Sequence, residues 1–252
     1  GTLRVGGTLT GVPVTTVNIM EDTSNVDFTL TLGQVIDAGQ KLELYSPMGS
    51  WTSTNQLVVG VSSDPGLAQA EVTATDGAKL DNKSAYVGCS FGGSGKVTIS
   101  GVDSATGSRS SWDTHLCHVA MHGNGEVVVE DGATWVNAGN FYLATGNDGI
   151  GKVTVTGINT ITNDHSTWQT LYASLGTLGT AEVVLENGGI WTATDTTLLS
   201  FGYVGNTTID VNTGGTWNLN GRLIYGFGTE VINLNGGLIQ TGTGIDFDAT
   251  PL

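Results

Sequence analysis

The chain has few positive charges: eight Lys and Arg stand against 23 Asp and Glu, and the formal net charge is −15. Nucleic acids and anionic membranes are bound by clustered Lys and Arg, so this balance argues against both as partners. No stretch approaches the roughly 18 consecutive apolar residues of a membrane-spanning helix, and we therefore expect no membrane span. Two cysteines are too few to identify the redox compartment.

Charged residues are scarce overall, at 12%, which is low for a disordered acidic chain. Hydrophobic residues make up 38%, enough for a core, and glycine is abundant, with 39 among 252 residues. That content is about twice the usual share and indicates many turns. The chain starts at Gly1 with no basic and apolar leader pattern, so we expect this sequence to lack any signal peptide. Composition thus predicts a folded, acidic, turn-rich β protein.

A short strand pattern recurs from about residue 57 onward. Its apolar anchor positions are separated by steps of 25, 30, 26, 30, 26 and 23 residues. A double repeat lies within this spacing, because Lys96–Trp112 aligns without gaps on Lys152–Trp168. Self-similarity at a fixed period is the signature of repeat architectures. The anchors are Val72, Val97, Val127, Val153, Val183, Ile209 and Ile232.

Each repeat has an apolar strand, a Gly-rich turn, the anchor strand, a second turn and a strand with a large residue. Three short strands in roughly 25 residues, with no helical pattern, exclude a βαβ fold and fit rungs that stack in parallel. We therefore predict an all-β, right-handed, single-stranded parallel β-helix of about seven regular rungs over residues 57–242. Residues 1–56, with strands expected at 26–32 and 41–45, are predicted to form an N-terminal cap and irregular first rungs. Residues 243–252 are predicted to form a C-terminal tail or cap.

The residue before each anchor alternates in charge along the first five repeats. In a parallel stack these residues are neighbours, and like charges there would repel one another. The alternation is therefore interpreted as an electrostatic ladder on a solvated face, with substrate binding by Lys96 or Lys152 as the alternative. The residues are Glu71, Lys96, Glu126, Lys152 and Glu182.

The repeat resembles a known one in two places. Tyr86-Val-Gly is followed by Gly93-Ser-Gly-Lys-Val-Thr-Ile-Ser-Gly101, and Gly149-Ile-Gly-Lys-Val-Thr-Val-Thr-Gly157 repeats the second part. This arrangement is similar to the passenger-associated repeat of type V secretion autotransporters and of PEP-CTERM-type surface proteins. The resemblance covers about residues 57–242 and implies a secreted or bacterial cell-surface β-helical stalk, but no reaction. Neither a translocator nor a sorting tail follows, so we expect a fragment or a freely secreted relative.

Three histidines fall within eight residues, at His115, His118 and His122. On a strand, His118 and His122 share one face about 13 Å apart, which is too far for a common ion. One interpretation is a structural or merely exposed role, and the other is a zinc or nickel site, functional or adventitious, with His118 and His122 as ligands. Gly146–Gly151 resembles a single calcium-binding nonapeptide. No organic cofactor is expected.

The two cysteines lie on successive rungs. The gapless alignment pairs Cys89 with Val119 and Val87 with Cys117, so the cysteines are offset by two residues. The expected Cβ separation of about 7–8 Å exceeds the roughly 3.8 Å of a disulfide. We therefore predict two buried, unbonded thiols.

Two corners are longer than the others, at 101–112 and 157–168, and should project from one edge of the coil. Function is often carried by loops on a rigid scaffold, so any cleft is expected beside them; solvated turns are the alternative. The candidate catalytic residues are Asp103, Asp113 and Arg109, and the candidate binding residues are Asp164, His165, Trp112 and Trp168.

The tryptophans admit two interpretations: they fill the coil, or they form an exposed sugar-binding strip. The sequence lacks the common motifs of serine hydrolases, zinc peptidases and phosphate-binding loops. Our first functional hypothesis is a secreted or surface stalk that adheres to glycans or glycoproteins. The alternative is a secreted hydrolase that uses paired Asp residues on glycans or on glycoproteins such as mucins, as a glycosidase, lyase or acid peptidase. The oligomeric state is left open.

Overall fold

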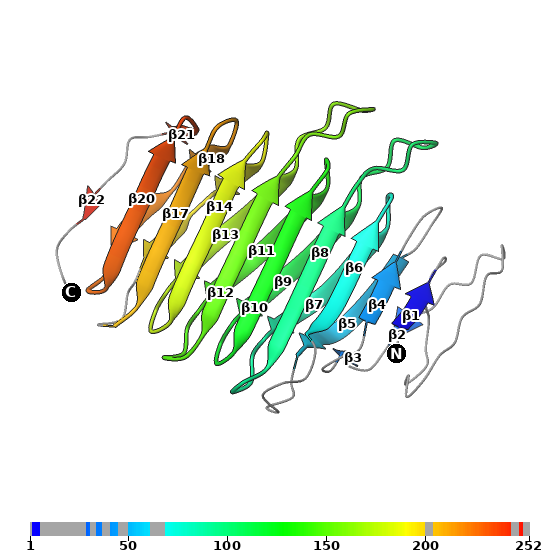
Figure 1. Ribbon diagram of the computed structural model, residues 1–252, viewed down its shortest axis with the longest axis horizontal. Helices are drawn as coiled ribbons and strands as arrows, with labels where there is room; N and C mark the ends of the chain where they lie inside the picture. Colours follow the sequence, from blue (N-terminus) through cyan, green and yellow to red (C-terminus); the bar gives the residue numbers. More distant parts are fainter. Residues whose placement is uncertain are drawn as a thin grey trace.

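The computed structural model describes residues 2–5, 29–30, 34–36, 41–44, 50–60, 69–199, 204–242 and 247–248. Their regular structure is β-strand, arranged as two parallel sheets that face each other (Figure 1). Within these residues, no helix is long and apolar enough to span a membrane.

The first sheet contains the anchor strands. Its order is β1 (Thr2–Val5), β4 (Lys41–Leu44), β6 (Ala70–Thr75), β8 (Ser94–Ser100), β10 (Asn124–Glu130), β12 (Ile150–Thr156), β14 (Thr180–Glu186), β17 (Asn206–Asn212) and β20 (Thr229–Asn235).

The second sheet contains the strands that carry the large residues. Its main order is β2 (Thr29–Leu30), β5 (Ser50–Val59), β7 (Lys79–Val87), β9 (Ser111–Val119), β11 (Thr134–Leu143), β13 (Thr167–Leu175), β15 (Ile190–Ala193), β18 (Thr216–Leu219) and β21 (Leu238–Thr241). Four further strands join it: β3 (Gln34–Ile36), β16 (Thr196–Leu199), β19 (Arg222–Tyr225) and β22 (Phe247–Asp248).

The chain forms a right-handed parallel β-solenoid. In Figure 1 the strands of the nearer sheet run upward and the next strands run down behind them, while the coil advances from right to left. Successive strands of each sheet pair in parallel. The predicted β-helix of about seven regular rungs is therefore confirmed.

The anchor column is confirmed residue by residue. Val72 pairs with Val97, Val97 with Val127 and Val127 with Val153, and the column continues to Ile232 at the C-terminal end. Alternate residues of these strands are buried, as in the pattern of β10, because successive side chains point to opposite faces of a sheet.

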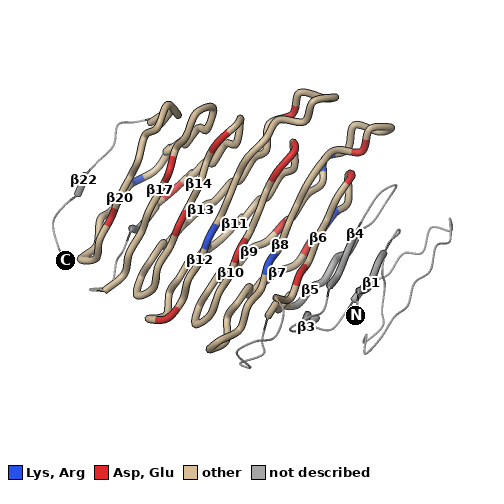
Figure 2. Tube along the Cα trace, in the orientation of Figure 1, with Lys and Arg blue, Asp and Glu red and all other residues tan. Residues whose placement is uncertain are grey.

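The predicted electrostatic ladder lies on the outer face of the first sheet. Lys96 Nζ lies 2.9 Å from Glu126 Oε2, and Lys152 Nζ lies 2.7 Å from Glu182 Oε1. In Figure 2 the two lysines appear as blue segments on β8 and β12, between the red acids of β6, β10 and β14. Both lysines thus have partners on the neighbouring rung, which supports the ladder over substrate binding.

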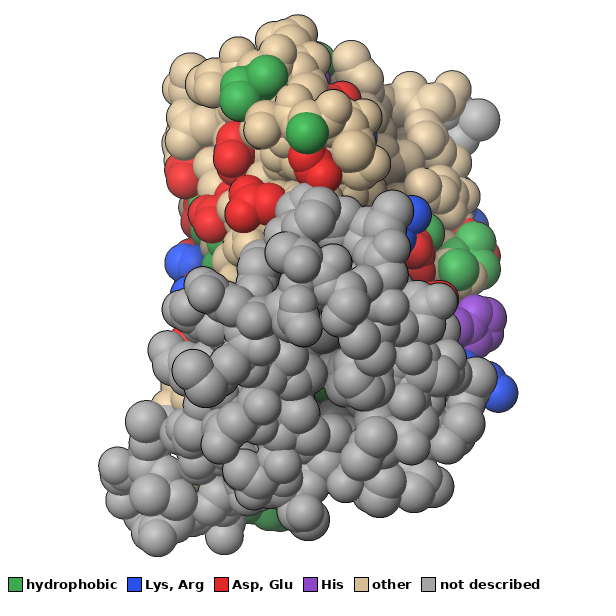
Figure 3. All heavy atoms as spheres, turned by 90° about the vertical axis from the view of Figure 1, so that its right-hand side faces the viewer, with side chains coloured by type: hydrophobic (Ala, Val, Ile, Leu, Met, Phe, Trp, Pro, Cys, Tyr) green, Lys and Arg blue, Asp and Glu red, His purple; other side chains and the backbone are tan. Residues whose placement is uncertain are grey.

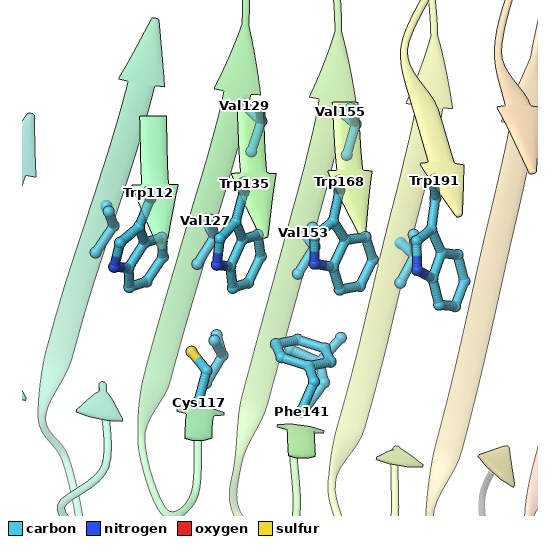
Figure 4. Packing of buried hydrophobic residues seen from close by; sticks show 14 of the residues in the cluster. Trp112, Cys117, Val127, Val129, Trp135, Phe141, Val153, Val155, Trp168 and Trp191 are labelled. Carbon is cyan, nitrogen blue, oxygen red and sulfur yellow. The ribbon is translucent and has the colours of Figure 1, made fainter. Parts of the chain in front are cut away.

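Five tryptophans fill the inside of the coil, one per rung, on the second sheet, and Figure 4 labels the first four of them. Each is at most 1% exposed, and each ring stacks on the next at centroid distances of 4.8, 5.2, 4.6 and 5.0 Å. The interpretation that they fill the coil is therefore the correct one. They are Trp112, Trp135, Trp168, Trp191 and Trp217.

The terminal regions are described only in part. β4 falls within the strand expected at 41–45 and pairs with β6, so the coil extends before residue 57 as irregular first rungs. β2 falls within the strand expected at 26–32, and β5 crosses from the predicted first region into the repeats. The residues predicted to form the end cap otherwise lie outside the described ranges. Within the predicted tail, β22 pairs with β19.

Candidate functional site

The two long corners are small hairpins braced by their own side chains. An antiparallel bridge joins Val102 to Arg109 in the first. Asp103 is 7% exposed, and its Oδ1 accepts hydrogen bonds from the backbone N–H groups of Ala105 at 2.8 Å and Thr106 at 3.3 Å. This is the local turn geometry in which Asp and Asn commonly serve. The carboxylate of Asp103 therefore holds its loop together.

Arg109 ties its corner to the next rungs. Its Nε donates to the backbone oxygen of Gly132 at 2.6 Å, and its Nη2 donates to Ala133 O at 3.0 Å. The same Nη2 also donates to the backbone oxygen of His165 and, at 3.3 Å, to Thr167 Oγ1. Burial lowers the pKa of Arg109, while the charge of Asp164 acts in the opposite direction. The guanidinium of Arg109 thus connects both long corners to the short turn that contains Gly132 and Ala133.

The second corner is anchored in the same way. An antiparallel bridge joins Ile158 to His165, and His165 Nδ1 donates to the backbone oxygen of Gly188 at 2.8 Å. Asp164 O accepts from the backbone N–H of Asn159 at 2.8 Å. The predicted binding residues Asp164 and His165 are therefore part of the corner's framework, and they line no described cleft. Figure 3 shows several acidic side chains close together at this end of the molecule, above the residues drawn in grey.

Asp113 does not join Asp103 and Arg109 in a cluster. It is exposed on β9, in register with Asp81 on β7. Burial raises the pKa of Asp113, the charge of Asp81 raises it further, and Lys79 acts in the opposite direction. The predicted catalytic set of Asp103, Asp113 and Arg109 is thus corrected to one stacked carboxylate pair, Asp81 and Asp113, and two framework residues.

Replacement of Asp113 by Asn should stabilise the protein at neutral pH by about 0.5 kcal/mol, since it removes a like-charge neighbour on an exposed strand. A carboxyl whose pKa is raised by folding destabilises the fold only when ionised. The gain should therefore shrink as the pH falls through the folded pKa of Asp113 and vanish below the unfolded value of about 3.9. Urea unfolding of both proteins at pH values across this range measures it. An unchanged gain at the lowest pH would contradict the charge explanation.

Trp112 and Trp168 were the remaining candidate binding residues, and this expectation is wrong. Both rings are 0% exposed and stack on Trp135. A side chain without exposed surface cannot contact a glycan, so the tryptophans act on the fold and not on a ligand.

The cysteines are unbonded, as predicted, but the expected burial is wrong for Cys89, and their register differs from the prediction. Cys117 pairs with Ala85, and Val119 pairs with Val87. Cys117 is buried, which raises its thiol pKa, whereas Cys89 is half-buried in the turn after β7. The alignment was displaced because the turn after β7 is longer than the turn after β9.

His118 belongs to a row of aromatic side chains on the outer face of the second sheet, which we call the aromatic row. The His118 ring stacks between the rings of Tyr86 and Tyr142, at centroid distances of 5.3 and 4.6 Å. Tyr172 packs edge-on against Tyr142 at a centroid distance of 6.0 Å. Burial lowers the pKa of His118, which favours the neutral ring. Across the described ranges, no group of three or more His, Cys, Asp or Glu residues is placed to hold a metal ion.

His122 lies apart from His118, in the turn after β9, and helps to line a pocket of about 380 Å³. Its ring stacks on Phe91 at 4.4 Å and 17°, and its Nδ1 lies 3.2 Å from Asp148 Oδ1. Phe91 is 65% exposed. We call it the corner pocket; it lies at the turns that follow β7, β9, β11 and β13, and not at the two long corners. Its lining includes Phe91, Met121, His122, Gly146, Asp148 and Leu178.

Gly146 allows the corner pocket to form. A Cβ at this position would overlap the backbone oxygen of Met121 and the ring of His122. The glycine-rich segment that resembled a calcium-binding repeat thus provides Asp148 and the space for His122. The sequence analysis missed this pocket, because its lining comes from four turns separated by whole rungs. A phenylalanine in a glycine-rich turn, Phe91 before Gly92 and Gly93, was the signal that could have found it.

The comparisons with known proteins found no matching family model, no matching curated protein and no matching solved structure.

Proposed function

We propose that this protein is a secreted or cell-surface stalk that binds glycans or glycoproteins at the corner pocket. The observation that carries the proposal is an exposed aromatic ring, Phe91, stacked on His122 beside the carboxylate of Asp148. Binding sites are typically concave and largely apolar, with a few polar groups that orient the ligand, and this pocket has that composition. The resemblance to autotransporter-type passenger repeats supports a secreted or bacterial surface location.

The aromatic row supports an extended ligand. Tyr86, His118 and Tyr142 each lie a few residues before a turn that lines the corner pocket, on three successive rungs. Their rings are half-buried, and because the His118 ring is stacked between the two tyrosines, the row presents mainly ring edges and polar atoms. A sugar chain could therefore contact the pocket with one residue and the row with others. A rigid solenoid is suited to presenting such a surface, because repeats stacked along one axis create extended binding faces.

The replacement Phe91→Ala tests the proposal. Screening of the wild-type protein on an array of microbial, plant and host glycans identifies a ligand, and titration calorimetry measures its affinity. Loss of the stacking surface should weaken binding about tenfold. The matched control is Phe227→Ala, which removes another exposed phenylalanine that does not line the pocket. Equal affinities of wild type and Phe91→Ala, or an empty array, would refute the proposal.

A glycan-cleaving hydrolase is the second candidate, and the stacked Asp81 and Asp113 pair is the observation that favours it. Neighbouring strands lie about 4.8 Å apart, which is close to the roughly 5–5.5 Å between the carboxyls of retaining glycosidases. The raised pKa of Asp113 is appropriate to a general acid. Incubation with mucins and polysaccharides should then release new reducing ends, and Asp113→Asn should abolish the release. Absence of any product removes this candidate.

A further inference from the structure

We infer that the corner pocket selects sugar residues that carry a free, protonated amine, with Asp148 as the partner of the ammonium group and Phe91 as the surface under the ring. This inference rests on the proposed glycan-binding function and narrows its ligand to amino sugars that are not acetylated. The argument uses the position of Asp148, the chemistry of the pocket lining and the charge of the whole chain.

Asp148 is positioned and accessible. Its side chain is 46% exposed, and one carboxylate oxygen lies 3.2 Å from His122 Nδ1, which orients the group. His122 is itself held by its stack on Phe91 at 4.4 Å. The carboxylate therefore stands beside an aromatic face at a fixed place. A ring face and a carboxylate together form a site that attracts an organic cation.

The residues that line the pocket disfavour binding of acidic sugars. Among the described residues that line the pocket, none is Lys or Arg. A uronic or sialic acid would bring its carboxylate beside Asp148 with no permanent cation to compensate, which costs binding energy. The net charge of −15 favours a cationic ligand at longer range as well. A neutral sugar could stack on Phe91 but would leave the carboxylate without a charged partner.

The experiment compares two matched probes: the tetramer of β-1,4-linked glucosamine and the same tetramer fully N-acetylated. Calorimetric titrations are made at about 0.15 M salt, where long-range charge attraction is screened, and at a pH that keeps the amines protonated. The glucosamine tetramer should bind about tenfold more tightly, as expected for a hydrogen bond between charged groups. Asp148→Asn should bring the two affinities close to equality.

The control is Asp195→Asn, which makes the same change at an exposed aspartate that does not line the pocket. It makes the net charge less negative by the same amount, so the preference for the free amine should survive if it depends on Asp148. Equal affinity of wild type for the two tetramers, or a preference that persists in Asp148→Asn, overturns the inference. If neither tetramer binds, the inference is also overturned, whereas the proposed function fails when the glycan array is empty or when Phe91→Ala binds the array's ligand as tightly as wild type does.

Discussion

Replacement of Trp168 by Ala should lower the free energy of unfolding by about 3–5 kcal/mol, the usual cost of removing a buried tryptophan. Trp168 lies in the middle of the tryptophan ladder and stacks on Trp135 and Trp191 at 5.2 and 4.6 Å. Phe141 also packs edge-on against it at 4.9 Å. The cavity would therefore open between two rungs at once. Denaturant unfolding, followed by tryptophan fluorescence and circular dichroism, measures the loss.

Gln169→Ala is the control for this prediction. Gln169 is the next residue on β13, and its side chain is exposed on the opposite face of the strand. Its replacement should change stability by no more than about 0.5 kcal/mol. A loss below about 1 kcal/mol for Trp168→Ala would show that the ladder is not the main source of the stability of the coil.

Phenylalanine replacements separate packing from hydrogen bonding in the ladder. Trp112 Nε1 donates to Asn82 Oδ1 at 2.7 Å, whereas Trp168 Nε1 has no hydrogen-bond partner among the described residues. Trp112→Phe strands the buried oxygen of Asn82 and should cost about 1–3 kcal/mol more than Trp168→Phe.

Replacement of Arg109 by Ala should destabilise the protein by about 2–3 kcal/mol, since it leaves backbone oxygens without their charged donor. The oxygens of Gly132 and Ala133 belong to a turn that is buried beneath the corner. The oxygen of His165 belongs to the second long corner, so both corners should loosen together. Urea unfolding measures the stability, and amide hydrogen exchange reports whether residues 101–110 and 157–166 lose protection.

Arg109→Lys distinguishes the role of geometry from that of charge. Lysine keeps the positive charge but lacks the planar fork that reaches several acceptors at once, so it should recover only a small part of the loss. Lys83→Ala is the control for removal of a cation, because Lys83 is exposed on β7, and it should change stability by no more than about 0.5 kcal/mol. Full stability of Arg109→Lys would contradict the assignment.

The framework roles of the corner residues could not be read from their sequence. Asp103, Arg109 and His165 are polar residues in long loops, and the same residue types serve in catalysis and in bracing turns. The gapless alignment of the two long corners placed Arg109 opposite His165, and the structure gives the two residues equivalent acceptors, Gly132 O and Gly188 O. The equivalence was therefore predictable, but the acceptors were not, since they belong to other rungs.

The amino-acid sequence by itself determined the coil. A strand alternates its side chains between two faces, so the period-two pattern around Val97 and Val153 identifies an inward column, and the regular steps between anchors identify the rungs. The alternating charges at Lys96 and Glu126 independently indicate which residues of neighbouring rungs lie side by side. These are local or periodic properties, which a linear sequence records directly.

Only the tertiary structure decided what the polar and aromatic side chains do. The sequence allowed the tryptophans to lie either in the core or on the surface, and the structure shows that the packing of the two sheets buries them. The gapless alignment shifted the cysteine strands by two residues relative to their true register, because turns of unequal length change the register between rungs. The sequence did not place the corner pocket, where Phe91, His122 and Asp148 meet from three different turns. Contacts between rungs depend on where the coil returns, and that is a property of the folded chain.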